Sequence, residues 1–302
     1  KFAEQLPNLI GGSADLEPSN YTGGFAKKYG DFQKDNRNGR NLAFGVREFP
    51  MAAIMNGMSL HSGIIPFGGT FLVFSDYSRP AIRLGSLQKI RAIHEFTHDS
   101  FYVGEDGPTH QPIEHTMSLR AIPDLQVFRP ADAKETAICF RLAVESKNKP
   151  SALLLTRQGV PVLKESIHDI EIGVQKGGYI LKKCEHAEIN IIATGSEVSL
   201  ALEVAEIMSD KKVQVVSLPC WEIFDTQPNE YQKKVIPPRG CLNISLEAGI
   251  TLGWGKYIGL NGMKIGIDHF GTCAPGNELA KEFGFTPKQV ESKIRDFIAS
   301  LK

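Results

Sequence analysis

The sequence predicts an α/β protein with mostly parallel sheets, divided into two domains. Short β-branched or aliphatic segments alternate with helix-like segments along the chain, and this alternation is typical of parallel sheets covered by helices. The length of 302 residues suggests two domains at roughly 150 residues each. A polar, glycine-containing stretch interrupts the alternation, so we expect domains at 1–165 and 186–302 joined by a linker at 166–185.

The expected elements follow from their residue patterns. Apolar, β-branched runs predict strands at 89–97, 125–130, 151–156, 189–194, 213–218, 241–247 and 264–270. Helical periodicity predicts helices at 50–60, 133–146, 196–210 and 286–301. The opening "KFAEQLPNL" (1–9) has the pattern of a helix interior, which favours a natural chain that begins before Lys1. In parallel sheets ligands bind beyond the carboxyl ends of strands, so loops after strands are the candidate sites.

Composition excludes several classes of protein. Lys plus Arg and Asp plus Glu both number 34, and the resulting zero net charge argues against a broad nucleic-acid surface or a charge-driven membrane partner. No apolar run approaches the roughly 18 residues of a membrane span. The five cysteines are widely spaced without a C-x-x-C pair, which indicates a reducing, cytoplasmic setting and no structural zinc site.

The segment "THDSFYVGEDGPTHQ" (97–111) directly follows an expected strand and holds His98 and His110 among three carboxylates. One interpretation is a solvated turn in which the histidines only cap the chain. A metal site is disfavoured, because the histidines lie twelve positions apart without a nearby ligand pair. The other interpretation is acid–base work on substrate hydroxyls, since histidine titrates near neutrality. Spacing alone leaves both open.

Three further signals each have two interpretations. Glu48 opens an apolar helical pattern, either as a charge that favours the helix dipole or as a carboxylate held in apolar surroundings to share a proton. Phe71, Phe74 and Tyr77 recur every three residues, as one helical stripe that faces either the core or a cofactor. Arg157 follows an apolar strand, where it would bind phosphate or form a surface ion pair.

Together these segments resemble the transketolases, which use thiamine diphosphate. The matching strings, in the family's order and spacing, are "GGSADLEPSN" (11–20), "GVREF" (45–49), "GGTFLVF" (68–74), "THDSFYVGEDGPTHQP" (97–112), "RPAD" (129–132), "TRQ" (156–158), "ATGSEV" (193–198) and "EAGI" (247–250). The resemblance implies two three-layer α/β/α domains, a thiamine diphosphate-binding fold that holds the pyrimidine ring and a transketolase C-terminal domain. The Gly-Asp-Gly signature of the family's N-terminal, diphosphate-binding domain does not occur here. We therefore expect part of a transketolase that is inactive alone.

The resemblance assigns five residues to the cofactor. Glu48 resembles the glutamate that hydrogen-bonds the pyrimidine nitrogen and so favours the tautomer that accepts a proton from the thiazolium ring. Phe71, Phe74 and Tyr77 match the aromatic pocket around the pyrimidine, and Asp15 matches an aspartate near the thiamine. The family's Mg²⁺ or Ca²⁺ would be held by the missing N-terminal domain, so we expect no metal ligands in this chain.

Five residues are similarly assigned to the substrate. His98 and His110 match histidines that contact sugar hydroxyls and act in catalysis, and Asp106 matches the aspartate that reads the configuration of the donor's C2 hydroxyl. Ser19 and Arg157 match residues that bind the sugar phosphate. If these assignments hold, the loop at 97–111 handles the hydroxyls of a polyol substrate.

The resemblance also implies an activity and partners. We expect a cytoplasmic, homodimeric transferase of the pentose phosphate pathway that moves a two-carbon ketol unit from a ketose phosphate to an aldose phosphate, without nucleic-acid or membrane partners. Asp106 with "GGSADLEPSN" favours this class. The alternatives are the corresponding part of a dihydroxyacetone synthase, a deoxyxylulose phosphate synthase or a pyruvate dehydrogenase beta subunit, or a non-catalytic dimerisation module.

Overall fold

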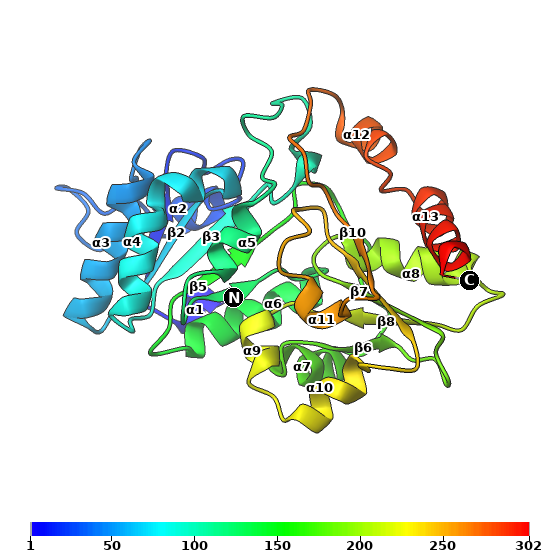
Figure 1. The fold of residues 1–302 in the computed structure, drawn as a ribbon. Helices are drawn as coiled ribbons and strands as arrows, with labels where there is room; N and C mark the ends of the chain where they lie inside the picture. Colours follow the sequence, from blue (N-terminus) through cyan, green and yellow to red (C-terminus); the bar gives the residue numbers. More distant parts are fainter. Residues whose placement is uncertain (1, 302) are drawn as a thin grey trace.

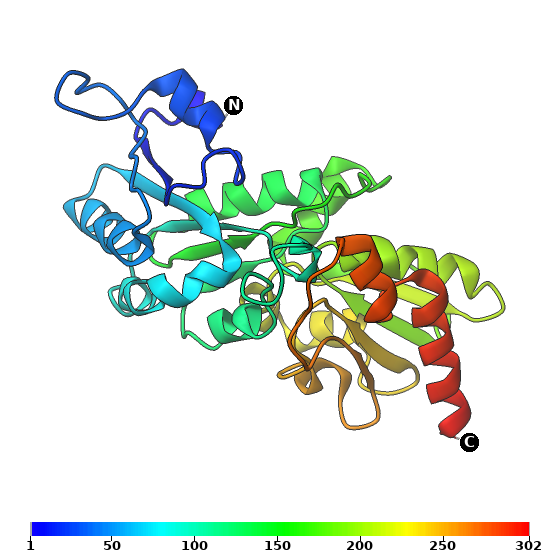
Figure 2. The same cartoon turned by 90° about the horizontal axis from the view of Figure 1, so that it is seen from above.

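The computed structural model describes residues 2–301 and contains two five-stranded sheets with helices on their faces (Figures 1 and 2). The first sheet is entirely parallel, in the order β1(Leu9–Ser13), β2(Ile65–Phe71), β3(Ile93–Thr97), β5(Ser151–Leu154) and β4(Gln126–Phe128). The helices of this half are α1(Phe2–Gln5), α2(Gly23–Tyr29), α3(Glu48–His61), α4(Ser75–Leu87), α5(His115–Arg120) and α6(Ala133–Glu145).

The second sheet is parallel except at one edge. Its order is β10(Met263–Ile265), β9(Leu242–Leu246), β7(Ile189–Ala193), β8(Val213–Ser217) and β6(Tyr179–Lys182), and only β6 runs antiparallel to its neighbour. Its helices are α7(Ile167–Gln175), α8(Glu197–Ile207), α9(Trp221–Asp225), α10(Asn229–Val235), α11(Gly255–Ile258), α12(Gly276–Glu282) and α13(Pro287–Ser300). The predicted α/β class with mostly parallel sheets is confirmed.

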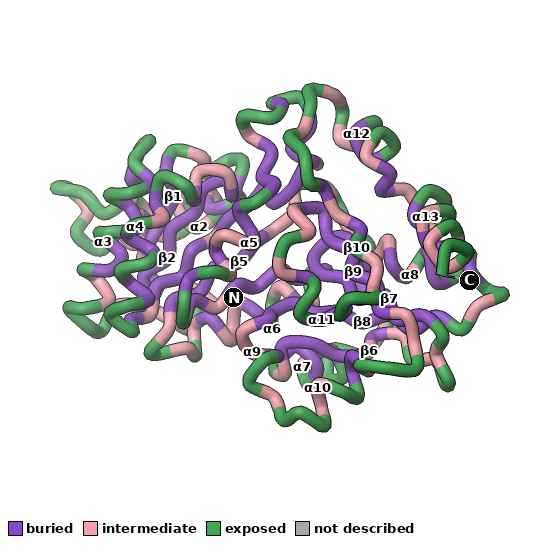
Figure 3. The backbone as a smooth tube through the Cα atoms, in the orientation of Figure 1, coloured by how far each residue is buried: buried purple, intermediate pink, exposed green. Residues whose placement is uncertain are grey.

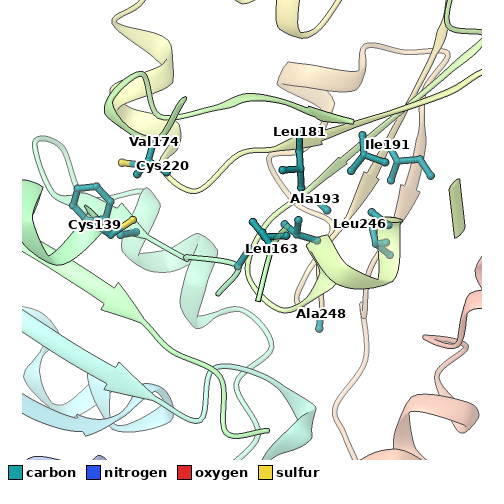
Figure 4. Packing of buried hydrophobic residues seen from close by; sticks show 14 of the residues in the cluster. Cys139, Leu163, Val174, Leu181, Ile191, Ala193, Cys220, Leu246 and Ala248 are labelled. Atoms are coloured by element: carbon teal, nitrogen blue, oxygen red, sulfur yellow. The ribbon is translucent and has the colours of Figure 1, made fainter. Parts of the chain in front are cut away.

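Side chains alternate between the two faces of the first sheet, as the period of a strand requires. Phe96 and Leu154 pack with α3 and α4, whereas Ile93 and Leu153 pack toward α6. The face toward α6 continues without interruption into the core of the second sheet, and Figure 4 shows Cys139 of α6 in the same cluster as residues of β7 and β9. One face of each sheet therefore belongs to a shared core, while the opposite faces pack in separate clusters. The strands of both sheets are largely buried (Figure 3).

Strands β1, β2 and β6 have no counterpart in the sequence prediction. β2 reads "IPFGGTF", and proline and glycine disfavour a strand. Its glycines are needed for packing: a Cβ on Gly68 would come within 2.5 Å of the sulfur of Met55. The helix expected over residues 1–9 is wrong beyond α1, because Leu9 begins β1.

Residues 166–185, expected to link two domains, contain α7 and β6, and β6 pairs with β8 in the second sheet. The division into residues 1–165 and 186–302 stays a prediction, and Lys1 and Lys302 lie outside the described residues. Within residues 2–301, every helix is too short or too polar to cross a bilayer.

Candidate functional site

The candidate residues gather at the carboxyl edge of the first sheet. Asp15 and Ser19 follow β1, His98 and Asp106 follow β3, and Arg157 follows β5. Because parallel strands end at the same edge, segments far apart in sequence meet there. The site therefore lies where the topology of a parallel sheet predicts a ligand.

Glu48 reaches the same edge by a different route. It is the first residue of α3, and α3 leads into β2 through a short connection. A helix that precedes a parallel strand runs opposite to it, so its N-terminus lies at the strand's carboxyl end. The predicted placement of Glu48 at the start of an apolar helix is confirmed, and its residue is only 9% exposed.

A cavity of about 510 Å³ brings together most of the predicted cofactor residues. We call it the ring cavity, and it is lined by Ala14, Asp15, Leu16, Val46, Glu48, Phe74 and Tyr77. It combines a buried carboxyl with two aromatic side chains from a separate segment. Such a site suits a flat, nitrogen-containing ring, which can pack on the aromatic faces and hydrogen-bond the acid.

The three aromatic residues do not lie on one helix, so the helical interpretation of their spacing is wrong. Phe71 ends β2, Phe74 closes a 3₁₀ turn at Leu72–Phe74, and Tyr77 lies in the first turn of α4. Their rings nevertheless follow one another in near-parallel planes. The centroids of Phe71 and Phe74 are 6.0 Å apart at 5°, and those of Phe74 and Tyr77 are 6.0 Å apart at 25°.

A second cavity of about 560 Å³ adjoins this series of rings. We call it the polar cavity, and it is lined by Pro18, Ser19, Asn20, Tyr21, Phe71, Glu95, Thr97, His98, Asp106, Leu155, Thr156 and Arg157. Phe71 connects the two cavities, since its ring stacks on Phe74 of the ring cavity and on His98 of the polar cavity, with a centroid distance of 3.8 Å to His98. Four of the five predicted substrate residues, all except His110, line the polar cavity.

His98 is held in an unusual state. Its backbone has a φ of 60°, a left-handed conformation that few residues other than glycine adopt and that clusters at functional sites. Burial, helped by the charge of Arg157 and opposed by Asp106 and Asp99, lowers the pKa of His98 to about 4. The imidazole is therefore neutral near pH 7 and offers one donor and one acceptor, with Nδ1 3.0 Å from the Thr97 hydroxyl.

His110 lines neither cavity. Its ring lies edge-on to Phe74 with centroids 5.6 Å apart, and its Nδ1 is 2.9 Å from the Thr109 hydroxyl. Contact with Phe74 nevertheless puts His110 at the margin of the ring cavity.

Comparison with known proteins identifies this arrangement. The family model described as "Transketolase, pyrimidine binding domain" matches residues 1–162, which is more than half of the chain. The chain belongs to the transketolase family. A second model, "Transketolase-like TK C-terminal domain", matches residues 177–286. The resemblance inferred from the sequence is thus confirmed for both parts of the chain.

Individual transketolases are similar to this chain in sequence and in fold. The transketolase of Geobacillus stearothermophilus is 50% identical over 298 residues, which cover 97% of this chain and 44% of that protein. Among solved structures, the transketolase from Leishmania mexicana superposes with a TM-score of 0.93 at 43% identity, covering 98% of this chain and 43% of that one. A transketolase from Pichia stipitis in complex with sedoheptulose 7-phosphate superposes with a TM-score of 0.92 at 41% identity, covering 99% of this chain and 44% of that one. This chain therefore spans less than half the length of these relatives.

Two charged residues near the site were not singled out from the sequence. Glu95 stands mid-strand in β3 and lines the polar cavity, and burial raises the pKa of its carboxyl to about 7. Arg129 follows β4 and is completely buried. The available signal was a charge within or directly after an apolar strand, the same signal that marked Arg157.

Outside these cavities, the described residues contain a group of metal-ligating types. Asp76, Glu114 and His115 each offer one ligand atom, and these atoms lie within 4.8 Å of one another. His115 Nε2 is 3.1 Å from Asp76 Oδ2, which accounts for the cluster as an ordinary ion pair or hydrogen bond. The prediction that this chain supplies no metal ligands stays a prediction.

Proposed function

We propose that this chain supplies the pyrimidine-binding side of a transketolase active site, which transfers a two-carbon ketol unit from a ketose phosphate to an aldose phosphate. The observation that carries the proposal is the position of Glu48. Its carboxyl shares one cavity with Phe74 and Tyr77, and that cavity adjoins a second one lined by sugar-binding residue types.

The ring cavity fits the aminopyrimidine of thiamine diphosphate. Phe74 and Tyr77 offer near-parallel aromatic faces, and Glu48 offers a hydrogen-bonding partner to a ring nitrogen at the buried start of α3. When bound, the cofactor supplies the nucleophilic carbon that carries the two-carbon unit. Glu48 holds and shares the proton at the pyrimidine nitrogen, while Asp15 adds a second carboxylate to the wall of the same cavity.

The polar cavity fits a sugar phosphate. Arg157 is exposed and forms no ion pair with any residue of 2–301, so its guanidinium and the Ser19 hydroxyl can receive a phosphate. Neutral His98 can both donate to and accept from a hydroxyl. Asp106 accepts hydrogen bonds from the donor's hydroxyls, and His110 acts from the margin of the ring cavity.

The proposal includes an assembly. Large apolar side chains are exposed along α3 and α4, and two of them, Val46 and Tyr77, line the ring cavity. The exposed residues are Val46, Phe49, Ile54, Leu60, Tyr77, Leu84 and Leu87. Exposed apolar surface of this kind supports contact with another protein surface. We therefore propose a homodimer. We further propose that it is a cytoplasmic enzyme of the pentose phosphate pathway, completed by a diphosphate-binding domain that holds Mg²⁺ or Ca²⁺. Residues 1–165 and 186–302 would be the two domains of this chain.

The experiment is to join this chain to the diphosphate-binding domain of the Geobacillus stearothermophilus transketolase and to assay the fusion, here called the joined enzyme. With thiamine diphosphate and Mg²⁺, we expect ketol transfer from xylulose 5-phosphate to ribose 5-phosphate, and no turnover by the 302 residues alone. A joined enzyme that accepts pyruvate instead would favour the related synthases or the pyruvate dehydrogenase type. A well-folded joined enzyme without activity on either donor would contradict the proposal.

A further inference from the structure

We propose that the second-sheet half of the chain holds the 97–112 loop in its substrate-binding conformation, and that buried Arg129 is the positioning residue at the base of that loop. The catalytic consequence rests on the proposed function, whereas the positioning itself does not. In Figures 1 and 2 this loop leaves the first sheet and lies beside the segment that leads into α12. We therefore expect the contacts that hold this loop to come from the second half.

The base of the loop is tied down by Arg129, which is 0% exposed. Its Nε donates to Asp99 Oδ2 at 2.8 Å, and Asp99 is the residue after His98. On the other side its Nη1 donates to the Thr194 carbonyl at 2.9 Å and to the Glu197 carboxylate. One guanidinium thus joins the loop to the start of α8.

The acidic partners of Arg129 in the second half, Glu197 and Glu247, accept further hydrogen bonds. Glu197 also accepts from the Ala248 amide at 2.9 Å. Glu247, 3.7 Å from Arg129, accepts two bonds of 2.9 Å from Arg120 and one of 2.8 Å from the Trp254 indole. Buried charges are stable only when paired and hydrogen-bonded in this way. Asp99 is thus tied through Arg129 to a network of buried, hydrogen-bonded charges, although Asp99 Oδ1 and Arg129 Nη2 have no partner among the described residues.

The tip of the loop is braced separately. The Gln111 amide is 2% exposed and donates to Gly104 within the loop at 2.9 Å and to Thr272 at 3.0 Å. The Cys273 thiol donates to the Glu105 carbonyl at 2.7 Å. Between base and tip, Phe101 packs on Phe283 and Phe285 of the second half with centroids 5.3 and 5.4 Å away.

This bracing explains how His98 keeps its conformation. A left-handed backbone at a non-glycine residue persists only where the surroundings over-determine it, and Asp99 is fixed immediately after His98. Arg129 lines neither the ring cavity nor the polar cavity. It therefore acts on substrate binding only through the loop that carries His98 and Asp106.

The test compares Arg129→Lys with Arg295→Gln. Lysine keeps the charge but cannot bind Asp99 and Glu197 with one planar group. The control removes an equally direct arginine–aspartate contact, that of Arg295 with exposed Asp210. In the 302-residue chain, NMR titration of the His98 ring should move its midpoint from about 4 toward the ordinary 6.5 in Arg129→Lys only. In the joined enzyme, kcat/KM should fall by roughly 10²-fold, the cost of misplacement by about 1 Å.

A structural role without positioning would leave the His98 titration and the kinetics unchanged in folded Arg129→Lys, and that result would overturn the proposal. If Arg129→Lys does not fold, the isosteric Glu197→Gln replaces it. This variant weakens the hydrogen bond from Arg129 without changing side-chain volume or the charges of Arg157, Asp106 and Asp99 that act on His98. An unmoved His98 titration there has the same consequence. An inactive joined enzyme would count against the proposed function, while the NMR result would still decide the positioning.

Discussion

Glu95 makes the stability of the fold depend on pH in a way that can be worked out from its surroundings. It lies in the middle of β3, opposite Gly69 and Leu153. It lines both the polar cavity and an apolar cavity of about 470 Å³ whose walls include Phe67 and Phe140. No residue of 2–301 forms a hydrogen bond or ion pair with its carboxyl. Burial accordingly raises its pKa from 4.5 to about 7.

The sign of the effect follows from which state holds the proton. Below pH 4.5 both the folded and the unfolded chain are protonated at Glu95, so the group costs nothing. Between pH 4.5 and about 7 only the folded state keeps the proton, and stability falls as pH rises. Above about pH 7 this loss of stability is complete. At 1.36 kcal/mol per pKa unit, the free energy of unfolding falls by at most about 3 kcal/mol. Water in the two cavities makes the actual loss smaller.

The assay is urea denaturation of the wild type and Glu95→Gln at a series of pH values from about 5 to 9, which brackets the raised pKa of Glu95. Glutamine keeps the shape without a titrating proton, so the difference between the two free energies of unfolding isolates Glu95. As the pH rises, the free energy of unfolding of Glu95→Gln should increase relative to that of the wild type up to about pH 7, and the difference should then stay constant. Exposed Glu282→Gln serves as the control and should parallel the wild type. A difference that does not change with pH would refute the inferred desolvation of Glu95.

Three further predictions address packing and substrate binding. Gly68→Ala should lower the free energy of unfolding by about 1–3 kcal/mol, because a Cβ would meet Met55, whereas Gly57→Ala, with nothing within 4 Å of its Cβ, should not. Equal denaturation midpoints for Gly68→Ala and the wild type would contradict the packing. Arg157→Gln in the joined enzyme should raise KM for a phosphorylated donor by about 10- to 100-fold and leave an unphosphorylated donor unaffected; an equal loss on both would rule out a phosphate role. His98→Ala should cost roughly 10²–10⁴-fold in rate, and the wild type should lose activity through His98 only near pH 4, so a limb near 6.5 assigned to His98 would count against its burial.

The sequence predicted the fold class and the places of Glu48, His98 and Arg157 because strand ends and helix starts are local signals. The roles of Asp15, Ser19 and Asp106 came only from the resemblance to transketolases. Glu48 begins α3 as expected, and His98 and Arg157 follow strands as expected. β2 was not predicted because its glycines are required by contacts with other segments. Gly68 packs against Met51 and Met55, and Gly69 packs against Asn20 and Thr22. No local pattern records such a contact.

The residues that organise the site were harder to find than those that line it. Arg129 acquires Glu197 and Glu247 as partners only when α8 and the end of β9 pack against the first half. The neutral state of His98 likewise depends on burial in the folded chain, whereas the residue type alone suggested titration near neutrality. Spacing identifies chemical groups, but burial and long-range pairing decide their charge and geometry.

Glu48→Ala in the joined enzyme, measured beside Glu230→Ala, gives the most direct test of the proposed chemistry. Both residues lie in the first turn of a helix, so each variant loses a dipole interaction of about 0.3–1 kcal/mol. If Glu48 shares a proton with the cofactor's ring, ketol transfer should fall by roughly 10²–10⁴-fold in Glu48→Ala and stay at the wild-type rate in Glu230→Ala. Wild-type turnover by a folded Glu48→Ala enzyme would show that this carboxyl serves only its helix.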